Sequence, residues 1–133
     1  MSYLLDTTVV SDFARGDVEV MRRLLATPAD RVAVSALTVM EVEYGLALAP
    51  ARARRLRPAL EALLETVEHI PFGEAEARAA ATLRAALRRR GRPIGVYDLL
   101  IAGTALARGL VLVTSNVREF ARVGGLSVED WRA

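Results

Sequence analysis

Short apolar runs alternate with segments of helical periodicity along the whole 133-residue chain. The runs have the length and composition of buried strands and lie at residues 3–6, 31–35, 68–72 and 110–114, with a last edge strand at 126–130. Helical patterns cover residues 7–15, 18–27, 37–49, 51–67, 74–90, 116–123 and much of 93–108. Because parallel strands need crossover helices, this alternation predicts a single α/β domain over residues 1–133. We expect a three-layer sandwich, in which helices flank a mostly parallel sheet of four to five short strands.

Composition narrows the class of protein further. Apolar residues make up 53% of the chain, which indicates a globular protein. The absence of cysteine excludes disulfides and thiolate metal sites. No apolar run approaches the roughly 20 residues that span a bilayer, and the start lacks the basic residues of a signal peptide. We therefore predict a cytoplasmic protein without membrane contact, whose net charge of +2 permits nucleic-acid binding without requiring it.

Three acidic residues stand in otherwise apolar segments. Asp6 ends the first predicted strand, Glu41 lies on the apolar helix at 37–49, and Asp98 is the one acid between residues 93 and 108. An unpaired buried carboxylate costs several kcal/mol, and ligands of α/β sheets bind at the carboxyl ends of the strands. We predict that the three carboxylates share one site, where Mg²⁺ or Mn²⁺ offsets their repulsion. The single histidine argues against zinc.

Each acid also has a purely structural explanation. Asp6 is suited to cap the helix that follows it. Glu41 stands three residues after Thr38, as in a capping box. Asp98 suits the first turn of its helix, where the helix dipole favours negative charge. Taken singly, these explanations are as good as the functional one, whereas three solitary acids together favour a shared site.

Four segments occur in an order and at a spacing that resemble a known family. The segments LLDTTVVSD, TVMEVEYGL, GVYDLLIAGTAL and LVTSNVREF, which span nearly the whole chain, look like those of PIN-domain proteins. More narrowly, they resemble the VapC-type toxins of bacterial toxin–antitoxin pairs. The resemblance implies a metal-dependent endoribonuclease, with metal-binding carboxylates at Asp6 and Asp98 and a further acid of the same cluster at Glu41.

Two positions depart from the pattern of this family. The fourth polar position, after the last core strand, falls on Asn116, whose neutral side chain would weaken a second metal site. Its structural explanation is an N-cap, with Glu119 three residues later closing a capping box. Thr8 stands where the family often has asparagine, and its hydroxyl is still able to orient a carboxylate or bind water. We therefore include Asn116 and Thr8 among the expected site residues.

The resemblance implies hydrolysis of RNA phosphodiester bonds. We expect Asp6 and Asp98 to bind the cation directly and Glu41 to bind metal-bound water, with one ion or two left open. The family also implies a homodimer and a small antitoxin that blocks the acidic site. An arginine cluster at residues 88–92 adjoins the Asp98 helix and is as well explained by phosphate contacts as by solvation. A second cluster at 52–57 is better explained as a solvated face.

Other functions compete with the toxin. A receiver domain needs a lysine, which this chain lacks, and an aspartyl phosphatase usually has D-x-D after its first strand. Neither a P-loop nor a G-x-G-x-x-G motif is present. A PIN-like nuclease with a housekeeping or DNA role, or a non-catalytic PIN-like binding module, remains an alternative.

Overall fold

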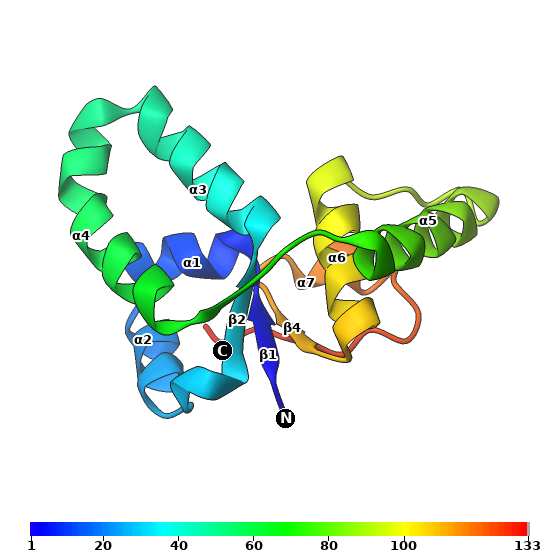
Figure 1. The fold of residues 1–133 in the computed structure, drawn as a ribbon, viewed down its shortest axis with the longest axis horizontal. Helices are drawn as coiled ribbons and strands as arrows, with labels where there is room; N and C mark the ends of the chain where they lie inside the picture. Colours follow the sequence, from blue (N-terminus) through cyan, green and yellow to red (C-terminus); the bar gives the residue numbers. More distant parts are fainter. Residues whose placement is uncertain (133) are drawn as a thin grey trace.

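The computed structural model describes residues 1–132, and residue 133 of the predicted domain lies outside the described part. A five-stranded sheet forms the centre, with helices on both faces, which confirms the predicted α/β sandwich (Figure 1). The strands are β1 (Tyr3–Leu5), β2 (Val32–Ser35), β3 (Glu68–Ile70), β4 (Val111–Val113) and β5 (Val128–Glu129). Every pairing is parallel, in the order β3-β2-β1-β4-β5.

The helices also follow the predicted sequence of elements. They are α1 (Thr7–Ala14), α2 (Val18–Leu25), α3 (Ala36–Leu48), α4 (Pro50–Thr66), α5 (Glu74–Arg89), α6 (Val96–Arg108) and α7 (Val117–Phe120), with a 3-10 turn at Ala29–Arg31. The predicted helix at 116–123 is the largest difference, because only one turn of it forms. None of the helices within residues 1–132 is long and apolar enough to cross a membrane.

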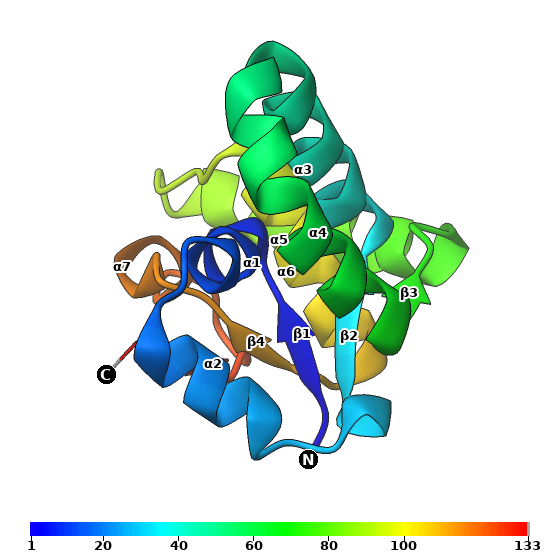
Figure 2. The ribbon, with the colours of Figure 1, turned by 90° about the vertical axis from the view of Figure 1, so that its left-hand side faces the viewer.

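Alternate residues of each strand face opposite layers of the molecule. Leu5, Val34 and Val113 pack into the cluster that contains residues of α1 to α4. Leu4, Ala33 and Leu112 pack into the cluster under α5, α6 and α7. Figures 1 and 2 show the same division, with the first four helices on one side of the sheet and the last three on the other. Both faces of the three central strands β1, β2 and β4 are therefore apolar, as in other buried parallel sheets.

The order of the strands places a crevice between β1 and β4. From β1 the chain moves outward to β2 and β3, and it then returns to β4 on the opposite side of β1. The two strands pair in register, with Leu5 opposite Val113. A sheet of this kind binds ligands at the carboxyl ends of its strands, where the chain changes direction. Asp6 and Thr114, which follow the two strands, therefore meet at the expected place for a site.

Close packing fixes the position of α6, which carries Asp98. The helix crosses α5 at Gly103, where an added Cβ would lie 2.8 Å from the Cβ of Ala80 and 2.9 Å from its backbone nitrogen. Real Cβ atoms do not approach so closely, so only glycine allows this distance between the helices. The α6 helix ends at Gly109, whose φ of 65° is the left-handed conformation typical of a residue that follows a helix.

Candidate acidic active site

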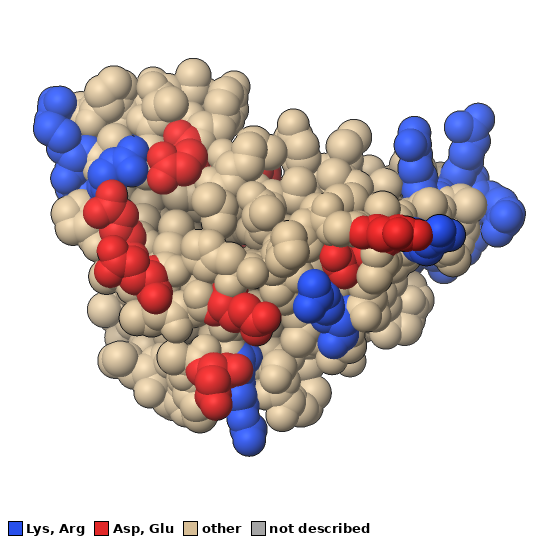
Figure 3. All heavy atoms as spheres, in the orientation of Figure 1, with Lys and Arg blue, Asp and Glu red and all other residues tan. Residues whose placement is uncertain are grey.

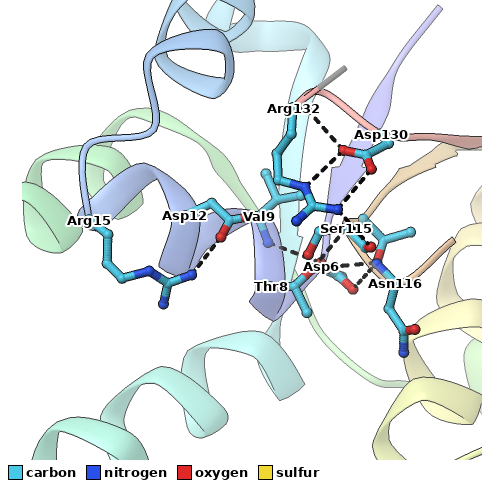
Figure 4. Close-up of polar contacts among 10 residues, drawn as sticks. Asp6, Thr8, Val9, Asp12, Arg15, Ser115, Asn116, Asp130 and Arg132 are labelled. Carbon is cyan, nitrogen blue, oxygen red and sulfur yellow. Dashed lines mark hydrogen bonds and ion pairs between the residues drawn. The ribbon is translucent and has the colours of Figure 1, made fainter.

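Asp6 follows β1 directly at this switch point and is almost completely buried, with 2% of its surface exposed. Its Oδ1 atom accepts hydrogen bonds from the Thr8 hydroxyl at 2.6 Å and the Val9 amide at 3.2 Å (Figure 4). Its Oδ2 atom accepts one from the Thr114 hydroxyl at 2.6 Å. The Val9 bond makes Asp6 the N-cap of α1, as its structural explanation predicted. The capping bond uses only one hydrogen bond to the carboxylate, so Asp6 is still able to serve as a functional residue.

Two hydroxyl groups hold Asp6 against the turn between β4 and α7. Thr8 Oγ1 accepts a hydrogen bond from the Ser115 amide at 3.0 Å, and Thr114 Oγ1 accepts one from the Asn116 amide at 2.9 Å. Each hydroxyl thus donates to the carboxylate and accepts from the backbone. Burial raises the pKa of Asp6, while these hydrogen bonds act in the opposite direction. The carboxylate is therefore fixed in place, and Thr8 is positioned to orient it.

Glu41 reaches the same region from α3. This helix starts immediately after β2, with Ser35 as its N-cap and the Leu37 amide donating to the Ser35 hydroxyl at 3.1 Å. The capping box expected for Thr38 and Glu41 is therefore wrong, because both residues lie beyond the cap. Glu41 Oε1 instead accepts a hydrogen bond from the Thr7 hydroxyl at 2.6 Å, beside Asp6 in the chain.

Asp98 and Glu119 converge on the start of α6. Asp98 lies in the first turn of that helix, as predicted. Glu119 comes from α7, and its Oε1 atom accepts a hydrogen bond from the Gly95 amide at 2.8 Å. A Cβ built on Gly95 would lie 3.7 Å from both Asp98 Oδ2 and Glu119 Oε1. The two carboxyl groups thus face the same small space at the N-terminus of α6.

The electrostatics of this pair are unusual. Burial, followed by the hydrogen bond to Glu119 and the charges of Glu119, Asp6 and Glu41, raises the pKa of Asp98 to about 8. The hydrogen bond from Asp98 lowers the pKa of Glu119. Asp98 therefore keeps its proton near neutral pH and donates a hydrogen bond to Glu119. The charges that act most strongly on Asp98 are all negative. A bound cation would offset the repulsion between these carboxylates.

Asn116 contributes in a different way from the one predicted. It occupies the N-cap position of α7, but its side chain does not cap the helix. Its Nδ2 atom instead donates to Glu119 Oε2 at 2.7 Å. The predicted capping box is therefore wrong. Glu119, which was expected only as a capping partner, is the acid from α7 that faces Asp98. The signal was present as the one acid in the segment LVTSNVREF.

The donor set suits a hard divalent cation. Four carboxylates from different parts of the chain lie near the switch point, namely Asp6, Glu41, Asp98 and Glu119. The one histidine, His69, is exposed, and its Nε2 atom lies 2.7 Å from the Leu64 carbonyl oxygen. Among residues 1–132, no three acidic, histidine or cysteine side chains are close enough to surround one ion as they stand. An ion held here would therefore contact few carboxylates directly and keep several waters, which is how Mg²⁺ usually binds.

A groove lies between α1, α3 and α4. It has a volume of about 340 Å³, and Thr7 and Glu41 lie among its lining residues. Its remaining walls combine apolar side chains such as Leu46 and Leu56 with the arginines Arg52 and Arg55. The groove thus places one of the four acids, Glu41, beside a surface of mixed apolar and basic character.

The chain is similar to known proteins over almost its whole length. The family model described as "PIN domain" matches residues 3–126. The tRNA(fMet)-specific endonuclease VapC of Shigella flexneri is 34% identical over 131 residues, which cover 98% of each chain. A chain of DNA-bound VapBC from Salmonella typhimurium is 34% identical and matches with a TM-score of 0.90 over 98% of each chain. A chain of VapBC-5 from Mycobacterium tuberculosis, a member of the VapBC family of toxin–antitoxin systems, is 31% identical, with a TM-score of 0.67 over 97% and 96% of the two chains.

Proposed function

This chain belongs to the PIN-domain family, and from that premise we propose that it is the toxin endoribonuclease of a toxin–antitoxin pair. The reaction is the hydrolysis of RNA phosphodiester bonds with Mg²⁺ or Mn²⁺. The observation that carries the proposal is that the charges of Asp6, Glu41 and Glu119 all act on Asp98, beside the switch point of the sheet. The full-length similarity to VapC nucleases supports it. An enzyme that acts on cellular RNA would work in the cytoplasm.

The four carboxylates have different parts in the reaction. Asp6, held by three hydrogen bonds, and Asp98 would bind the cation directly. A bound divalent ion supplies an activated water and neutralises charge that develops on the phosphate oxygens. Glu41 would orient water from its place beside Thr7. Glu119 holds the Gly95 amide and faces Asp98, so it would position that carboxylate or bind water itself. Thr8 orients Asp6, and Asn116 orients Glu119.

The first prediction tests the activity itself. Because relatives at about a third identity are named tRNA(fMet)-specific endonucleases, we expect the purified protein to cut initiator tRNA in Mg²⁺ or Mn²⁺. Excess chelator should stop the reaction. Elongator methionine tRNA is the matched control, and gel electrophoresis of end-labelled RNA is the measurement. Intact initiator tRNA after prolonged incubation with either metal would contradict the proposal, whereas equal cleavage of both tRNAs would contradict only the substrate.

The second prediction concerns the metal. Binding of Mn²⁺ to the native state should stabilise the protein by about 2.7 kcal/mol at a concentration one hundred times the Kd. Thermal unfolding at increasing Mn²⁺ measures this gain, and titration calorimetry gives the number of ions. Asp30→Asn, which alters an exposed acid in the 3-10 turn, should respond like the parent. The absence of both heat and a melting shift would refute the metal site.

The third prediction concerns the partner. We propose that an antitoxin segment occupies the groove between α1, α3 and α4 and places an arginine among the acids, since arginine binds carboxylates in bidentate pairs. Co-expression with the neighbouring reading frame should give a stable complex that neither cuts RNA nor binds Mn²⁺. Expression of the chain alone should arrest growth. A complex that keeps full metal binding and full nuclease activity would exclude this mode of inhibition.

We further propose that the protein is a homodimer. Five large apolar side chains are well exposed on α3 and at the start of α6, namely Met40, Tyr44, Leu48, Val96 and Tyr97. The helices α3 and α6 contact one another although they belong to opposite layers of the sandwich. Burial of such a surface is what a second copy of the chain would provide.

A further inference from the structure

A second hollow, separate from the partner groove, lies between the end of α5 and the start of α6. Its volume is about 690 Å³. The floor is apolar and includes Leu87, Ile94 and Leu99, while Arg84 and Arg88 stand on its rim. These two arginines are four residues apart on α5, so they lie on the same face of the helix. The hollow therefore combines an apolar floor with two guanidinium groups on one side.

The arginines at this end of α5 have no acidic partners. None of the ion pairs among residues 1–132 involves the four residues Arg84, Arg88, Arg89 and Arg92. Figure 3 shows basic side chains projecting into solvent where α5 ends, on the right of the view. Arginines in the last turn are also favourable to the helix dipole, but Arg84 lies more than one turn before the end. This surface thus carries positive charge that the protein itself does not neutralise.

The hollow and the acidic crevice share a wall. Pro93, Ile94 and Val96 line the hollow, whereas the Gly95 amide between them is bound by Glu119 in the crevice. A strand of RNA whose phosphate reached Asp98 would therefore meet the hollow after crossing the first turn of α6. Because the crevice holds four carboxylates, it repels phosphates. An adjacent basic surface is needed to hold the rest of the strand.

We propose that this hollow binds one unstacked nucleotide of the RNA substrate, with its phosphates on Arg84 and Arg88 and its base against the apolar floor. The proposal rests on the proposed ribonuclease function and adds a site for substrate recognition to it. Single-stranded RNA is recognised through splayed bases that stack on aromatic or guanidinium surfaces. Flipped bases also pack between apolar side chains. Both charged residues of this lining are arginines, and their positive charge is complementary to the phosphates of RNA.

The test compares two double variants that remove the same charge. Arg84→Ala/Arg88→Ala empties the rim of the hollow. The control variant Arg31→Ala/Arg54→Ala removes two exposed arginines that line neither the hollow nor the partner groove. Fluorescence anisotropy with labelled initiator tRNA in chelator measures Kd, and cleavage in Mg²⁺ measures KM. We expect the rim variant to raise Kd and KM by about tenfold and to reduce the slope of log Kd against log salt by about 1.5. The control variant should change Kd less than twofold.

A third variant tests whether the base of the bound nucleotide contacts the apolar floor. Ile94→Ser makes the floor polar, and it should weaken tRNA binding at least threefold while leaving the binding of inorganic polyphosphate, which has charge but no bases, unchanged. Equal effects of the rim and control variants on tRNA binding, or equal loss of tRNA and polyphosphate binding with Ile94→Ser, would overturn the nucleotide site. So would a rim variant that changes self-association in size-exclusion chromatography but not RNA binding. A parent protein that neither binds nor cuts any tRNA would instead refute the ribonuclease function on which the site depends.

Discussion

Asp98→Asn should lower RNA cleavage by about 100-fold or more while it makes the metal-free protein more stable. The two effects have opposite signs because the negative charge of Asp98, which would hold the cation, destabilises the folded state when no cation is bound. In the folded state, burial and neighbouring carboxylates raise the pKa of Asp98 to about 8, from an ordinary value of 3.8. The folded protein therefore binds this proton more tightly than the unfolded chain does. Ionisation of Asp98 opposes folding.

The sign of this effect fixes the pH at which it is visible. Below about pH 4 the carboxyl group of Asp98 is protonated in both the folded and the unfolded state. The parent and Asp98→Asn should then have similar free energies of unfolding. As the pH rises towards 8, the parent loses stability relative to the variant, and above 8 the difference is constant. Since Asp98 is partly exposed, water screens the interaction. We expect a gain of about 1–2 kcal/mol for the variant, well below the full equivalent of the pKa shift.

Urea unfolding in chelator between pH 4 and 9 measures this difference, and initiator-tRNA cleavage gives the loss of activity. The matched control is Asp30→Asn, which changes an exposed acid and should alter neither quantity. A variant that is less stable than the parent at pH 8 would show that the contacts of Asp98 stabilise the folded state instead of destabilising it. Full cleavage activity in the variant would remove Asp98 from the proposed metal ligands.

Glu119→Gln should also reduce cleavage by about 100-fold. The amide oxygen of glutamine is still able to accept the hydrogen bond from Gly95, so α6 should keep its position. The variant loses the negative charge that faces Asp98, and its amide nitrogen cannot accept the hydrogen bond from Asn116. Asn116→Ala should cost less than tenfold, because Asn116 acts through Glu119 and carries no charge.

Single-turnover cleavage of initiator tRNA measures both variants, with Mn²⁺ melting shifts as a second readout. Glu65→Gln, which changes an exposed acid on α4, serves as the control for the loss of one carboxylate. An equal loss of activity in Asn116→Ala and Glu119→Gln would mean that the orientation of Glu119, and not its charge, limits the reaction. Retained activity in Glu119→Gln would exclude this acid from the site.

The sequence by itself determined the architecture, because strands and helices are encoded by local patterns. The apolar runs at 3–6, 31–35 and 110–114 became β1, β2 and β4, and the alternation of elements required a parallel sheet with helices on both faces. Asp6 was identifiable because a lone acid at the end of a buried strand is unusual. Its capping bond to Val9 was predictable too, since it spans only three residues.

Tertiary structure alone decided which polar groups meet. Thr114 donates to Asp6 across 108 positions of the chain, and Thr7 donates to Glu41 across 34. Glu119 faces Asp98 because α7 folds against the start of α6, which brings its carboxylate to the Gly95 amide. No local pattern encodes such contacts, because they depend on the order of strands in the sheet and on the close crossing of α5 and α6 at Gly103. The proton on Asp98 follows from the same packing, since its pKa is set by burial and by charges that lie far away in the sequence.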